Sequence, residues 1–250
     1  MEPTTLLVLV AAAFATSILS AIIGMAGGIV LLSVMLLFME PLEAIPLHGA
    51  VQLVSNGSRT WIQRTHVERG IVWRYALLLL PMSFVGLAIA QSLSPPVARA
   101  LIGVFVLLAT WAPSALLIGA HPERADRNRR FIVLGGVVGV VNMTVGATGP
   151  LIAPFFLNLG LARQGVIGTK AACQALGHLA KLAVFGVAGF AFLAYAPPLL
   201  LLSLAVVAGT WVGSRILGRV SEVWFTRLYK GVLTLIALRL VVWPWIDALR

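Results

Sequence analysis

Long stretches of apolar residues, separated by short polar ones, follow one another along the whole chain. They lack the strict apolar–polar alternation of a half-buried strand, so they predict helices. The segments 29–39 and 151–161 are short: eleven residues at about 1.5 Å each give about 16 Å. That length cannot cross a bilayer core of about 30 Å. Helices are predicted over 5–23, 29–39, 45–65, 71–92, 97–117, 131–144 and 151–161.

Composition identifies the class of protein. Mean hydropathy is +1.01, 60% of the residues are hydrophobic and 10% are charged, against about a quarter charged in soluble domains. We therefore predict an all-α integral membrane protein with no separate soluble domain. The N-terminus lacks the positive region of a cleaved signal peptide, so the first segment is expected to remain. The single cysteine, Cys173, excludes a disulfide framework, and no cofactor or metal is predicted.

The chain matches itself when it is shifted by 122 residues, from Gly24 onto Gly146, and later by 128. This predicts two transmembrane repeats, 1–118 and 131–250, joined by a basic linker at 119–130. The polar matches carry the argument because polar residues are scarce here. The pairs are Gly24 and Gly146, Gly27 and Gly149, Ala50 and Ala172, Gln52 and Gln174, Asn56 and His178, Arg59 and Lys181, then Arg99 and Arg227, Gly103 and Gly231, and Leu107 and Leu235.

Loop charges predict that the repeats have opposite orientations. Lys and Arg accumulate in cytoplasmic loops, so the net charge of +10 reports topology rather than nucleic-acid binding. The 61–74 loop and the linker are basic, whereas the 94–96 connection between them is not. In the second half the loop at 191–198 is uncharged, and the loop equivalent to 94–96 is flanked by arginines and a lysine. The expected fold is two inverted repeats, each a glycine-broken hairpin followed by three transmembrane helices, an arrangement typical of transporters with a midplane site.

The glycine-rich breaks are the first part of the predicted site. Backbone N–H groups at membrane depth are tolerated only where they are buried in protein or line a cavity. Helices that begin near Ile29 and Leu151 would point their N-termini inward, which favours an anion. The alternative is that these glycines only permit close helix packing. Whether the first hairpin is re-entrant or makes two full crossings stays open. The predicted residues are Gly24, Met25, Ala26, Gly27, Gly28, Gly146, Ala147, Thr148 and Gly149.

A stripe of polar residues on the next helix of each repeat is the second part. The spacings of four, four and three residues place each stripe on one helix face. Gln52 and Gln174 could instead hydrogen-bond between helices, and Arg59 and Lys181 could extend to the headgroups. No acidic residue falls within the apolar segments, so proton coupling would use His48 or His178 and sodium coupling would use backbone carbonyls and hydroxyls such as those of Thr144 or Thr148. The stripes are His48, Gln52, Asn56 and Arg59, then Lys170, Gln174, His178 and Lys181, of which all but His48 and Lys170 are placed in the site.

The stretches AIIGMAGGIVLL, HVERGIVWR and SPPVARALIGVFVLL, in this order, resemble the TauE/SafE family of anion permeases. The resemblance covers nearly the whole chain, because the second repeat has the same order. It implies a multi-pass carrier of the bacterial inner membrane for sulfite, sulfonates or related anions. It also implies that five glycines bind substrate: Gly24, Gly27, Gly28, Gly146 and Gly149. The chain departs from the more glycine-rich family pattern at Met25, Ala26, Thr148 and Pro150.

The leading hypothesis is therefore a transporter of small sulfur-containing anions that works by alternating access around a midplane site between the repeats. Its partners would be the anion, the lipid bilayer and a coupling ion, H⁺ or Na⁺. An anion channel on the same architecture is the alternative. An intramembrane enzyme with Ser55 or Ser58 as nucleophile and His178 as base is a third hypothesis, but no acid is present to orient the histidine. We predict that the chain is not an enzyme.

Overall fold

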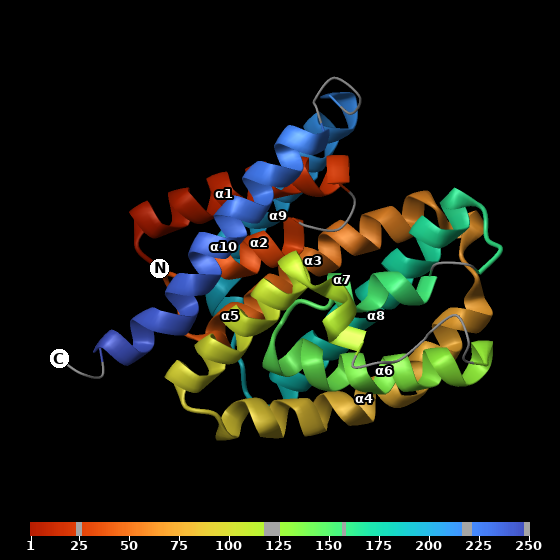
Figure 1. Cartoon of the computed structure of the whole chain (residues 1–250), viewed down its shortest axis with the longest axis horizontal. Helices are drawn as coiled ribbons and strands as arrows, with labels where there is room; N and C mark the ends of the chain where they lie inside the picture. Colours follow the sequence, from red (N-terminus) through yellow and green to blue (C-terminus); the bar gives the residue numbers. More distant parts are fainter. Residues whose placement is uncertain (24–26, 118–125, 157–158, 217–221, 248–250) are drawn as a thin grey trace.

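A computed structural model describes residues 1–23, 27–117, 126–156, 159–216 and 222–247. These residues form helices and connecting segments, with no strand among them (Figure 1). The all-α prediction is thus confirmed for the part of the chain that is described. The elements are α1 (Pro3–Ile23), α2 (Gly27–Met35), α3 (Pro41–Ile62), η1 (Arg64–His66), α4 (Arg69–Ser92), α5 (Pro95–Trp111), η2 (Pro113–Leu117), α6 (Arg127–Thr144), α7 (Gly149–Ile152), η3 (Ala153–Phe156), α8 (Arg163–Val187), η4 (Phe192–Tyr195), α9 (Ala196–Ile216) and α10 (Glu222–Asp247).

The second hairpin differs from its prediction. A single helix is expected over 151–161, but the chain forms a four-residue α7 followed by the 3₁₀ turn η3. Pro154 contributes to the change because it has no N–H to donate to the carbonyl of Pro150, although the longer helices α3 and α4 continue through Pro46 and Pro81. The first hairpin keeps a longer second arm, the nine-residue α2.

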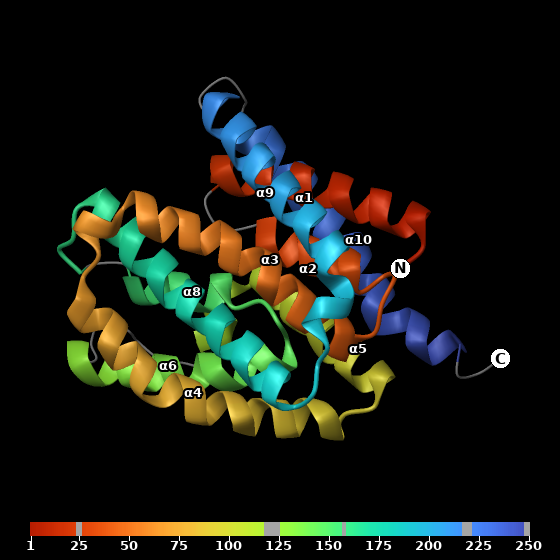
Figure 2. The same ribbon diagram turned by 180° about the vertical axis from the view of Figure 1, so that it is seen from behind.

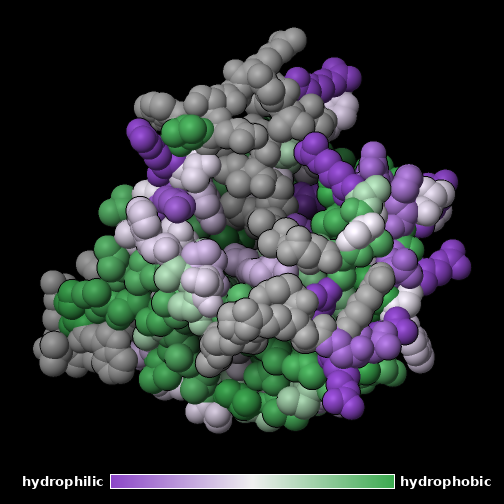
Figure 3. Space-filling view, turned by 45° about the vertical axis from the view of Figure 1, so that its right-hand side comes forward, coloured by the Kyte–Doolittle hydropathy of each residue, from purple (hydrophilic) through white to green (hydrophobic). Residues whose placement is uncertain are grey.

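Among the described residues, three helices are long and apolar enough to span a membrane: Pro3–Ala21, Arg69–Ser92 and Phe192–Gly213. Their outward faces carry large apolar side chains that other helices leave uncovered, as expected for contact with lipid. Figure 3 shows such side chains over the lower part of one face, with hydrophilic ones along its right-hand edge. Examples of the exposed residues are Leu77, Leu80 and Phe84 on α4, and Leu200, Leu204 and Val207 on α9.

Four helix pairs build the bundle: α4 with α6, α1 with α9, α3 with α8, and α5 with α10 (Figures 1 and 2). Glycines four residues apart bring two of these pairs close together, since a side chain at these positions would collide with the opposite backbone. These four glycines lie outside the breaks, and their role is to permit close packing of helices. The contacts are Gly135 with Tyr75, Gly139 with Leu79, Gly209 with Phe14, and Gly213 with Ile18.

The connections with described contacts gather at two ends of the bundle. At one end, the backbone N–H of Glu68 donates to Thr169 Oγ1 over 3.0 Å. Asp126, the N-cap of α6, lies at the same end: the N–H of Arg129 lowers the pKa of its carboxyl, and the nearby charge of Arg74 adds to this. This end holds the segments expected to be cytoplasmic.

The opposite end holds the segments that are expected outside. Tyr195 donates to Glu43 Oε1 over 2.9 Å, and Arg99 forms an ion pair with Glu40 at 2.9 Å. These contacts join the start of α3 to η4 and to the start of α5. Basic and weakly charged connections are therefore separated in space, in agreement with the loop charges.

Candidate functional site

A small polar pocket lies where α3 and α8 pack together. It leaves about 30 Å³ for the centres of water-sized molecules, and a single water needs about 10–15 Å³. Both halves of the chain form its walls. The lining residues are Ser20 from α1, Gly28 and Ile29 from α2, His48, Gln52, Asn56 and Arg59 from α3, Ala147, Thr148, Gly149 and Pro150 from the α6–α7 break, and Gln174 and His178 from α8.

The α3 stripe holds the first hairpin in place. His48 Nε2 lies 2.8 Å from the carbonyl oxygen of Gly28. Gln52 packs closely on Gly28: a Cβ atom added at Gly28 would lie 3.1 Å from Oε1 of Gln52. Two helical turns further on, Arg59 donates from Nη2 to Ser20 Oγ over 2.9 Å. The stripe thus fixes the end of α1 and the start of α2 around the pocket, with the Arg59 guanidinium half-buried at its wall.

The α8 stripe does the same for the second break. Lys181 is fully buried, and its Nζ donates to the carbonyl oxygen of Gly146 over 2.8 Å. Gly146 has φ +85°, in the left-handed region that only glycine adopts without strain. Lys181 therefore does not extend to the headgroups. It holds the turn from behind the pocket wall.

Two histidines meet at the centre of this arrangement. The rings of His48 and His178 lie edge to face, with centroids 6.0 Å apart and planes at 80°. Both side chains are buried, and Lys181 is close enough to interact electrostatically with each of them. The described lining carries the cationic Arg59 and several amides, and it includes no carboxylate. Such a set of groups can hold a small anion through charge and N–H donors.

The sequence matches the sulfite exporter TauE/SafE family over residues 9–240. The chain belongs to the TauE/SafE family. This is a family of membrane transporters of sulfite and related anions, so the chain is a multi-pass membrane protein. Neither the curated proteins nor the solved structures contain a significant match to it.

Most of the residues expected in the site of this TauE/SafE protein come together around the pocket. Gly28, Gln52, Asn56 and Arg59 meet Ala147, Thr148, Gly149, Gln174 and His178. Gly27 does not line it: a Cβ there would strike the backbone of α1, so this glycine serves helix packing. Gly146 and Lys181 lie behind the lining. Gly24, Met25 and Ala26 lie outside the described residues.

The helix N-termini contribute unequally to this TauE/SafE pocket. α2 begins at Gly27 and runs for nine residues, and its Gly28 and Ile29 face the pocket, so it supplies a positive helix end. α7 has four residues with Pro150 at its start, so it offers neither a comparable dipole nor an N–H at that residue. The prediction that a second helix N-terminus near Leu151 helps to bind the anion as α2 does is therefore wrong.

Several pocket residues were outside the predicted set. His48 lies on the polar stripe and was assigned only to proton coupling, although its spacing already places it with Gln52. Ile29 adjoins the first break, Ser20 lies four residues before it, and Pro150, where the chain departs from the family pattern, adjoins the second break, so proximity in sequence was their signal. Lys170, also on the stripe, is half-buried and does not line the pocket.

Proposed function

We propose that this TauE/SafE protein carries small sulfur-containing anions, such as sulfite or organosulfonates, across the inner membrane of a bacterium. The observation that supports this most is the pocket itself. It is small, it is lined from both halves, and it combines a guanidinium, amide groups and the start of α2 without a described carboxylate. Its space of about 30 Å³ suits an ion of a few heavy atoms.

Alternating access between inverted repeats is the proposed mechanism, and the packing of the helices supports it. If α1–α5 are exchanged with α6–α10, the pair α1 with α9 becomes α6 with α4, and both pairs exist. The pairs α3 with α8 and α5 with α10 map onto themselves. The equivalent helices α3 and α8 run in opposite directions, as do α5 and α10 (Figures 1 and 2). A two-fold axis in the membrane plane relates elements in this way.

A proton is the coupling ion that we propose, with the His48–His178 pair as its site. A positive charge on this pair attracts an anion, and a bound anion in turn favours protonation, since such coupling is reciprocal. The groups around the pair are the Gly28 carbonyl on α2 and Lys181 on α8, with Arg59 at the pocket wall. Of the two threonines that sodium coupling would use, Thr148 lines the pocket and Thr144 does not.

The double variant Gln52→Ala, Gln174→Ala tests the proposed site in proteoliposomes. We expect sulfite and sulfonate flux to fall at least tenfold, since both amides line the pocket. Gln91→Ala is the matched control, because Gln91 is exposed near the end of α4 and should transport normally. Undiminished flux in a folded double variant would place the substrate elsewhere, and unitary conductance in planar bilayers would show a channel instead.

A further inference from the structure

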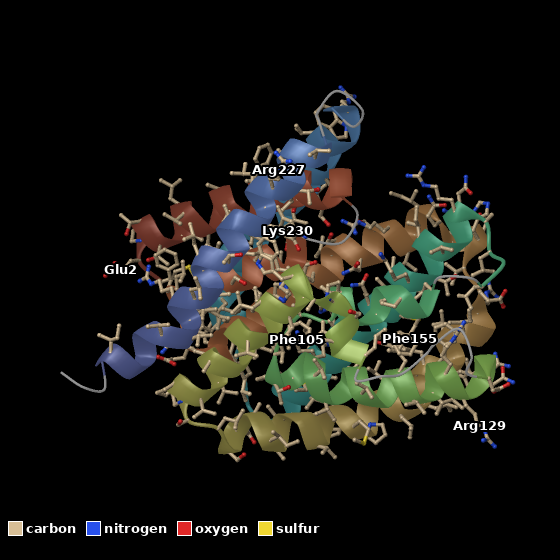
Figure 4. All side chains as sticks on the ribbon, in the orientation of Figure 1. Glu2, Phe105, Arg129, Phe155, Arg227 and Lys230 are labelled. Carbon is tan, nitrogen blue, oxygen red and sulfur yellow. The ribbon has the colours of Figure 1, made fainter. Side chains whose placement is uncertain are left out.

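A second, much larger hollow lies away from the central pocket, between the end of α5 and the start of α10. It leaves about 680 Å³ for the centres of water-sized molecules and is open to the surface. Arg227 and Lys230, one turn apart on α10, are labelled beside it in Figure 4. The α5–α10 groove is lined by Trp111, Val223, Thr226, Arg227, Lys230 and Gly231.

The groove exists because α5 stops while α10 continues. α5 ends at Trp111, and the chain turns into η2 at Pro113. Nearer the middle of the pair, Gly103 is packed tightly, and a Cβ there would touch Val241 and Ala237 of α10. Gly231, its equivalent at the shift of 128 residues, has no atom within 4 Å of where a Cβ would be. The helix pair is therefore tightly packed near its middle and open where α5 ends.

The arginines near the starts of α5 and α10 also differ in whether they have an acidic partner. Arg99 in the first repeat is paired with Glu40 at 2.9 Å. Its equivalent, Arg227, is exposed and has no ion pair or hydrogen bond with any described residue. The position aligned with Glu40 at the shift of 122 is Ala162, so the second repeat supplies no carboxylate in its place. Among the described residues, Arg227 therefore has no carboxylate partner like the one that Glu40 gives to Arg99.

The remaining walls are fixed and suit an amphipathic ligand. Lys230 Nζ lies 5.0 Å from the centroid of the Trp111 ring, a cation–π contact. The indole N–H of Trp111 donates to Thr234 Oγ1 over 2.9 Å, and this hydroxyl donates to the Lys230 carbonyl over 2.7 Å. Val223 and the exposed ring of Trp111 give the groove an apolar side next to its basic one.

We propose that the α5–α10 groove binds an anionic phospholipid of the cytoplasmic leaflet, with the phosphate held by Arg227 and Lys230. The basic linker that follows η2 is expected on the cytoplasmic side, where anionic lipid headgroups attract basic residues at the ends of transmembrane helices. The lipid phosphate forms an ion pair with Arg227, as Glu40 does with Arg99. The acyl chain lies against Val223 and Trp111. The site is separate from the central pocket and does not depend on the substrate proposed there.

The test measures lipid binding to the delipidated protein in detergent, by native mass spectrometry, with phosphatidylglycerol as the probe and phosphatidylcholine as the neutral comparison. The wild type should retain phosphatidylglycerol preferentially. Arg227→Gln with Lys230→Gln should weaken this binding about tenfold or more, since each basic group near a headgroup contributes substantially. The matched control is Arg64→Gln, an exposed arginine 4.7 Å from the centroid of the Trp61 ring that lies outside the α5–α10 groove.

Three outcomes would overturn the proposal. They are equal binding of both lipids by the wild type, an unchanged affinity in the double variant, and an equal loss in the Arg64 control. A further measurement adds inorganic phosphate at millimolar concentration to the wild type with bound phosphatidylglycerol. If phosphate alone displaces the lipid from the wild type, the groove binds a soluble anion and the lipid assignment is wrong. The double variant should still transport anions through the central pocket, so a failure here would be distinct from a failure of the proposed function.

Discussion

Lys181 donates a hydrogen bond from a fully buried Nζ to the carbonyl oxygen of Gly146, 2.8 Å away. Lys181→Met removes the donor and leaves this carbonyl without it in a buried turn. We expect the free energy of unfolding to fall by about 1–3 kcal/mol, seen as a lower Tm in detergent. Lys170→Met on the same helix is the control: Lys170 is half-buried near Arg59, so its loss should not destabilise the protein. Equal losses in both variants would contradict a specific role for the Lys181 bond.

Gly146→Ala should destabilise the break for two reasons. The φ of +85° is strained for alanine, at about 1–2 kcal/mol, and a Cβ would lie 2.8 Å from Leu32 and 2.9 Å from Ile45. Gly189→Ala separates the two effects, because Gly189 has φ +92° but open space around its Cβ position. A Tm decrease clearly larger for Gly146→Ala is the expected result of thermal unfolding. Equal decreases would mean that the contact with the first repeat adds nothing.

Single cysteines can test the opposite orientation of the repeats. Thr65→Cys follows α3 and Leu193→Cys follows α8, and both side chains are exposed. A membrane-impermeant maleimide added to intact cells should label position 193 and spare position 65 until the cells are opened. The native Cys173 is buried and gives a silent background. Labelling of both positions from the same side would rule out the inverted repeat.

Proton coupling should depend on the central histidines. In proteoliposomes, a pH gradient should accelerate uptake of methanesulfonate from the acidic side several-fold, since a sulfonate keeps its charge at neutral pH. His48→Gln and His178→Gln should keep downhill flux but lose most of this acceleration, because the pair lines the pocket. His66→Gln, at an exposed histidine in η1, should respond as the wild type does. Acceleration that persists in both pocket variants would exclude the pair as the proton site.

Much of the fold could be predicted from the sequence because apolar segments in a membrane protein have few alternatives to helices. α1, α3 and α4 begin and end within four residues of the predicted segments. Two predicted segments are wrong in part: after Gly149 the α-helix gives way to the 3₁₀ turn η3, and the helix expected over 97–117 ends at Trp111 and is followed by η2. Their apolar character was read correctly, but the backbone hydrogen bonds that a proline removes were not considered.

The candidate site was predictable where residues share one helix face, as Gln52 and Asn56 do. What could not be predicted is the contact between halves, because spacing along one helix says nothing about its partner. The meeting of His48 with His178 depends on how α3 crosses α8. The same holds for the direction of Lys181, which could equally have extended outward and instead turns to Gly146.

Each glycine break is anchored by a side chain from its own half of the chain: Gly28 by His48, and Gly146 by Lys181. Between α3 and α8, by contrast, the rings of the two histidines contact each other edge to face. Ring edges can slide past one another at low cost, whereas the anchors would have to break. We therefore expect spin labels placed within one repeat to keep their spacing during turnover, and labels placed on opposite sides of the contact between α3 and α8 to separate and return.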